Sequence, residues 1–62
     1  MRYEATYNIP AEFPFIKTRM TDHLQSALDF IGEHDGTIID HAEGVTYTRK
    51  DFEQLNEYLL LG

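Results

Sequence analysis

The side chains that could do chemistry in this chain are one serine, three histidines and eleven carboxylates, and there is no cysteine. Ser26 is expected on the exposed side of a predicted helix, where no general base held by an orienting group is evident for a nucleophilic serine. His23, His34 and His41 match no i, i+3 or i+4 ligand spacing, although folding could bring two or three of them together. We therefore expect no enzyme, no metal site and no other cofactor.

The carboxylates are the more informative group, because they outnumber Lys and Arg eleven to five and give the 62-residue chain a formal charge of −6. No Lys or Arg lies between Met20 and Thr48. Such a charge repels nucleic-acid phosphates and anionic lipid headgroups and attracts basic surfaces. The predicted partner is a basic protein, with no direct binding to nucleic acid or to a membrane. Six carboxylates are the candidate contacts: Asp22, Asp29, Glu33, Asp35, Asp40 and Glu43.

Phe30 is the candidate apolar anchor of this interface. It stands on the flank of a predicted helix, between an apolar and an acidic side, and aromatic residues are enriched among binding hot spots. The alternatives are that Phe30 packs into the core and that the acids only keep the protein soluble. Our specific hypothesis is an inhibitor or modulator of phage or mobile-element type. Its carboxylates would imitate the phosphates of DNA and mask the nucleic-acid-binding surface of a host protein.

Self-association is the competing interpretation. The last predicted helix runs from about residue 49 toward residue 61 with an inward side made of Phe52, Leu55 and Leu59. Leu61 then points roughly to the opposite side, with Leu60 at the edge and Tyr58 nearby. These three residues could form the patch of a homodimer, since two-fold dimers are the commonest closed assembly.

The N-terminal elements follow from hydrophobic periodicity. Residues 2–9 alternate, with Tyr3, Ala5, Tyr7 and Ile9 on one side, which predicts a strand buried on one face. Pro10 and Pro14 then interrupt any pairing ladder. We expect residues 10–17 to form an extended connector whose Phe13 and Phe15 cap the core, with a short edge strand as the alternative.

A helix is predicted next. Thr21-Asp22 resembles an N-cap followed by a first-turn carboxylate, although the helix could begin near Lys17. Its expected end is His34-Asp35-Gly36, where Gly36 can adopt the left-handed conformation. The buried side recurs at helical spacing in Met20, Leu24, Ala27, Leu28 and Ile31.

Residues 37–41 and 45–48 predict a β-hairpin closed by the three-residue loop Ala42-Glu43-Gly44. In this register Ile39 lies opposite Tyr47. Thr48 and Asp51 then form a variant capping box for the last helix.

The element order β-α-β-β-α predicts an α+β two-layer sandwich, a three-stranded antiparallel sheet with two helices on one face. Residues 1–62 are long enough for one small domain only. The longest apolar run is too short to span a bilayer and the start lacks a signal-peptide pattern, so we expect a cytoplasmic protein.

One local resemblance involves Ile38-Ile39-Asp40, Thr46-Tyr47 and the helical segment from Asp51 to Asn56. This pattern is similar to the strand–turn–strand–helix near the start of AMP-forming adenylating enzymes and covers about a third of the chain. In that family the unit is scaffold and not the nucleotide site. The resemblance therefore implies a local β-β-α unit and no activity.

Overall fold

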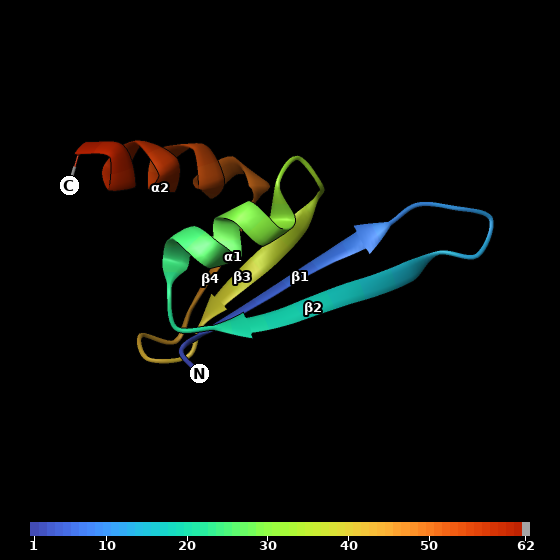
Figure 1. Cartoon of the computed structure of the whole chain (residues 1–62), viewed down its shortest axis with the longest axis horizontal. Coiled ribbons are helices and arrows are strands. Elements are labelled where there is room, and N and C mark those ends of the chain that lie inside the picture. Colours follow the sequence, from blue (N-terminus) through green and yellow to red (C-terminus); the bar gives the residue numbers. More distant parts are fainter. Residues whose placement is uncertain (62) are drawn as a thin grey trace.

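The computed structural model describes residues 1–61 as a sheet with two helices packed on it (Figure 1). The elements are β1 (Tyr3–Ile9), β2 (Phe15–Thr21), α1 (Leu24–Ile31), β3 (Gly36–Asp40), β4 (Val45–Thr48) and α2 (Arg49–Leu61). The sheet has four strands in the order β2-β1-β3-β4, and each neighbouring pair is antiparallel. The α+β class is as expected.

The prediction of a three-stranded sheet is wrong, because a strand, β2, occupies residues that we assigned to a connector and a helix start. It pairs with the whole of β1, from Ile9 opposite Phe15 to Tyr3 opposite Thr21. A spacing of four residues, as between Ile16 and Met20, fits one side of a strand as well as one side of a helix. Pairing with the free edge of β1 decides between them. Met20, which we placed in the buried helical stripe, is 41% exposed.

The first helix accordingly begins later than predicted. Thr21 ends β2 and is buried, and Asp22 lies between the strand and the helix. The N-cap of α1 is His23, which makes no side-chain capping hydrogen bond. Instead, its backbone N–H donates to Thr21 Oγ1 at 3.2 Å.

The helix also ends earlier than predicted, at Gly32 rather than Gly36. Gly32 has φ 56°, and its N–H donates to the Leu28 carbonyl at 2.9 Å. Gly36 is instead the first residue of β3, where a Cβ would collide with the Thr6 carbonyl oxygen on β1. Glycine is thus required at residue 36 for close strand pairing and not for a left-handed turn.

The β3–β4 hairpin forms, but the predicted pairing of Ile39 with Tyr47 is wrong by one residue. Ile38 lies opposite Tyr47 and Asp40 opposite Val45. The turn therefore contains residues 41–44, because Asp40 both ends β3 and accepts hydrogen bonds from the turn backbone. The shift places Ile38 in the core with no exposed surface.

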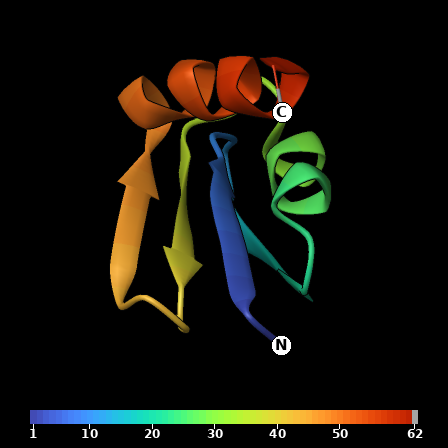
Figure 2. The same cartoon turned by 90° about the vertical axis from the view of Figure 1, so that its left-hand side faces the viewer.

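The core lies between the helices and the inward side of β1 and β3. Its buried apolar residues are Tyr3, Ala5, Tyr7, Ala27, Leu28, Ile31, Ile38 and Phe52. In Figure 2, α2 runs across the strand ends and α1 stands beside the sheet. The helix α2 begins as predicted, since the Asp51 carboxylate accepts the Thr48 N–H at 2.9 Å.

The β1–β2 hairpin extends well beyond the helices, in a molecule of 40 × 22 × 16 Å (Figure 1). Phe13, at its turn, is 81% exposed, and Phe15 is 48% exposed. The prediction that both cap the core is wrong, because the hairpin carries them away from it. Among residues 1–61, no helix combines the length and apolar character needed to cross a membrane.

Candidate protein-binding surfaces

Asp40 is a structural carboxylate rather than a surface one. It is 2% exposed, and Arg2 Nε and one terminal guanidinium nitrogen each donate to it at 2.9 Å. The N–H groups of Ala42 and Glu43 also donate to Asp40, at 3.0 and 3.3 Å. The hydrogen bond from Arg2 lowers the pKa of Asp40, against the opposing effect of burial. Asp40 thereby ties the chain start to the β3–β4 turn and is not available to a partner.

Two other candidate carboxylates lie around the same arginine. The backbone N–H of Arg2 donates to Asp22 Oδ1 at 3.1 Å. Glu43 belongs to the turn that Asp40 closes. Asp22, Asp40 and Glu43 therefore gather at the end of the sheet where β1 begins.

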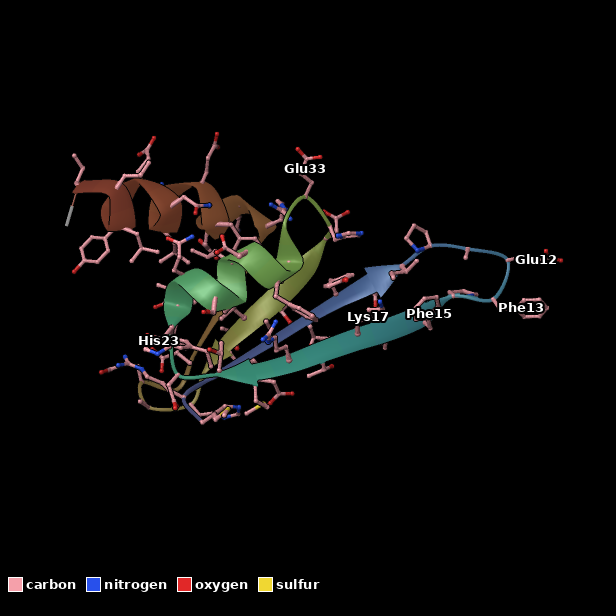
Figure 3. The ribbon with its side chains drawn as sticks, viewed as in Figure 1. Glu12, Phe13, Phe15, Lys17, His23 and Glu33 are labelled. Carbon is pink, nitrogen blue, oxygen red and sulfur yellow. The ribbon has the colours of Figure 1, made fainter. Side chains whose placement is uncertain are left out.

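The remaining three candidates lie toward the opposite end of β1. Asp29 accepts a hydrogen bond from Gln25 Nε2 at 2.9 Å on the exposed side of α1. Glu33 and Asp35, together with Asn8, Pro10 and His34, line a half-open depression of about 420 Å³. Glu33 projects outward from the turn after α1 (Figure 3). Five residues of strand, roughly 17 Å at ~3.4 Å each, separate Tyr3 from Asn8, so the structure divides the six candidates between two regions.

Little of the negative charge is neutralised internally. Within residues 1–61, Asp40 forms an ion pair with Arg2 at 2.9 Å, and Glu4 Oε1 contacts His41 Nε2 at 2.9 Å, a contact that is an ion pair only when His41 is protonated. Arg49 instead donates to the backbone carbonyls of Gly32 and His34 at the end of α1. Most of the carboxylates therefore face solvent without a cation beside them.

Two exposed acidic residues of α2 were not among the contacts predicted from the sequence. Glu53 and Glu57 are exposed on α2, and their spacing of four places them on one side of the helix. The helices α1 and α2 contact each other. We call the exposed acids that they carry, Asp29, Glu53 and Glu57, together with Glu33 in the turn after α1, the acidic helical layer. The spacing is visible in the sequence, but both glutamates lie outside the stretch between Met20 and Thr48, which has no Lys or Arg and from which the six candidate carboxylates were taken.

Phe30 is half-buried against the core margin. Its ring centroid lies 5.0 Å from that of Tyr7, and the Tyr7 ring also stacks on His34 at 4.3 Å. Much of the Phe30 ring is thus engaged within the chain, beside the carboxylates at the end of α1.

The three predicted self-association residues lie together in the last turns of α2. Tyr58, Leu60 and Leu61 are 71, 87 and 90% exposed. The neighbouring Leu59 packs on the core. The end of α2 marked C in Figure 1 therefore carries three exposed apolar side chains.

The histidines are dispersed over three local environments. His23 lies at the start of α1 (Figure 3). His34 Nδ1 lies 3.1 Å from the Ile31 carbonyl, and His41 Nε2 contacts Glu4 Oε1 at 2.9 Å. In the described part of the chain, no three His, Asp or Glu side chains are arranged to hold a metal ion. The absence of a metal stays a prediction.

Comparisons of the chain with protein-family models, with curated proteins and with solved structures find no match. The resemblance of residues 38–56 to adenylating enzymes therefore gains no support from them, and no family function is carried onto this chain.

Proposed function

We propose that this chain is a protein-binding module whose acidic surface contacts a basic protein. The observation that supports it is the −6 formal charge, counted with neutral histidines, combined with a single ion pair between a carboxylate and a Lys or Arg side chain within residues 1–61, Arg2–Asp40. An uncompensated field of this sign accelerates the encounter with a basic partner, and that effect weakens as salt is added.

The helical layer is the preferred contact surface. It carries Asp29, Glu33, Glu53 and Glu57, all of them exposed. The open face of the sheet offers a less accessible carboxylate, because Glu4 is partly buried and contacts His41 Nε2 at 2.9 Å. Buried Asp40 is left out of the contact set. In the specific form of the proposal, the partner surface normally binds nucleic acid, and the carboxylates replace its phosphates, as in an inhibitor carried by a phage or mobile element.

Charge reversal at one end of the molecule, compared with reversal at the other, tests this proposal. The variant D29K/E33K should capture less of a basic protein from cell extract, and the loss should shrink at high salt. D22K/E43K is the matched control, because it changes charge equally at the Arg2 end of the sheet. For the captured protein, association rates and competition by duplex DNA would then be measured. Equal capture by the parent and D29K/E33K at low salt would contradict the proposal.

The exposed end of α2 supports homodimerisation as a second candidate function. An apolar patch made of Tyr58, Leu60 and Leu61 would be covered in a two-fold dimer. Sedimentation at two protein concentrations would reveal the dimer, and L60D/L61D should convert it to a monomer. A parent chain that is monomeric at both concentrations would exclude this candidate.

A further inference from the structure

We propose that the free edge of β2 binds an extended acidic segment of another protein, which adds to the sheet as a fifth strand. This site is separate from the acidic helical layer and does not depend on the function proposed above. The occupant is defined by its chemistry: a β-strand with carboxylates at alternate positions.

The edge is long, regular and uncovered. β2 has seven residues, pairs with β1 along its length and lies at one end of the strand order. Residues 15–20 are exposed. An edge strand of this kind leaves a row of backbone N–H and C=O groups facing solvent, which is the template for adding a strand. β2 runs along the margin of the molecule in Figure 1.

The side chains of β2 define two different sides. Lys17 and Arg19 lie opposite Tyr7 and Ala5 and therefore stand on the same side of the sheet as the helices. Figure 3 shows Lys17 next to Phe15 on the hairpin, and Lys17 Nζ lies 5.9 Å from the Phe15 ring centroid. Considering residues 1–61, neither Lys17 nor Arg19 makes an ion pair. The edge thus presents two free cations in a chain of net negative charge.

The other side of β2 is apolar. Ile16 is 66% exposed and Met20 is 41% exposed, with Thr18 between them. Alternate residues of an added strand would contact this side, while those between them would meet Lys17 and Arg19.

Charge argues against a second copy of this chain as the occupant. Two copies of β2 could pair antiparallel with most of each strand overlapping and with their helix-side residues opposite one another. Such a pair places Lys17 opposite Lys17, Lys17 opposite Arg19, or Arg19 opposite Arg19. Like charges directly opposite each other destabilise a strand pair, and edge cations commonly prevent self-pairing for this reason. The same two cations attract an acidic strand, so charge complementarity favours that occupant.

A synthetic peptide is a direct probe of the edge. The heptapeptide would have glutamates opposite Lys17 and Arg19 and valines opposite Ile16, Thr18 and Met20. Its binding would be followed by amide chemical shifts of the full chain at low salt. One control peptide has lysine in place of each glutamate, and a second keeps the glutamates but has N-methylated backbone amides, which cannot donate hydrogen bonds to β2.

The expected result is that the glutamate peptide shifts the β2 amides and binds about tenfold more tightly than the lysine peptide, a difference of about 1.4 kcal/mol. The N-methylated peptide should not bind. The variant K17E/R19E, whose fold is checked by its own spectrum, should reverse the preference between the two charged peptides. Shifts confined to other elements, or an unchanged preference in K17E/R19E, would overturn the proposal. Binding of the lysine peptide that is lost in D29K/E33K alone would assign that peptide to the acidic layer instead.

Discussion

Shortening the side chain at residue 38 by one methylene, compared with the same change at residue 39, tests the observed hairpin register. Ile38 has no exposed surface and lies opposite Tyr47, whereas Ile39 faces the open side of the sheet and is partly exposed. Burial of one methylene contributes ~0.8 kcal/mol, and Ile→Val changes in cores cost about 0.5–1.5 kcal/mol. Valine keeps the β-branch, so strand propensity changes little between the two variants.

We therefore expect I38V to lower the free energy of unfolding by about 1 kcal/mol and I39V to change it by less than about 0.5 kcal/mol. For a domain of this size, 1 kcal/mol corresponds to a fall in Tm of about 4–8 °C. Urea and thermal unfolding followed by circular dichroism would measure both, with an unchanged m-value as the check that the denatured state is unaltered. A larger loss for I39V than for I38V would refute the observed register and support the one expected from the sequence.

Three further predictions concern single residues. D40N should destabilise the protein at neutral pH, because Arg2 would lose its carboxylate partner. Since the pKa of Asp40 is lowered on folding, its contribution is complete above the ordinary aspartate pKa of about 3.9 and is lost as the pH falls through the folded value. The difference in urea midpoint between the parent and D40N should therefore shrink toward pH 2, and an equal difference at both pH values would disagree with this linkage. G36A should abolish cooperative unfolding, because the added Cβ meets the Thr6 backbone, and a folded G36A protein would contradict the close β1–β3 approach. G44A has open space around it but φ 67°, so its loss should be only about 1–2 kcal/mol by thermal unfolding.

Several parts of the molecule were predictable because they depend on neighbours in the chain. The alternation of Tyr3, Ala5 and Tyr7 correctly indicated the buried side of β1. The left-handed Gly44 and the capping of α2 by Asp51 also follow from residues a few positions apart.

The candidate sites were predictable only in part. The exposure of Tyr58, Leu60 and Leu61 agrees with their predicted position on the outer part of the last helix. Asp40 was chosen as a surface acid because it lies in a stretch without cations. Its actual partner, Arg2, is 38 positions away, so no local pattern could reveal the pair.

Tertiary structure, and not the local sequence, decides that residues 15–21 form a strand and not a helix. Their spacing satisfies both periods, and only β1, with a second edge to pair, selects the strand. Once β2 forms, α1 is displaced toward the C-terminus, the hairpin carries Phe13 and Phe15 away from the core, and the predicted carboxylates separate. Local periodicity identified most of the elements, while long-range backbone pairing determined their number, their limits and the surfaces that they expose.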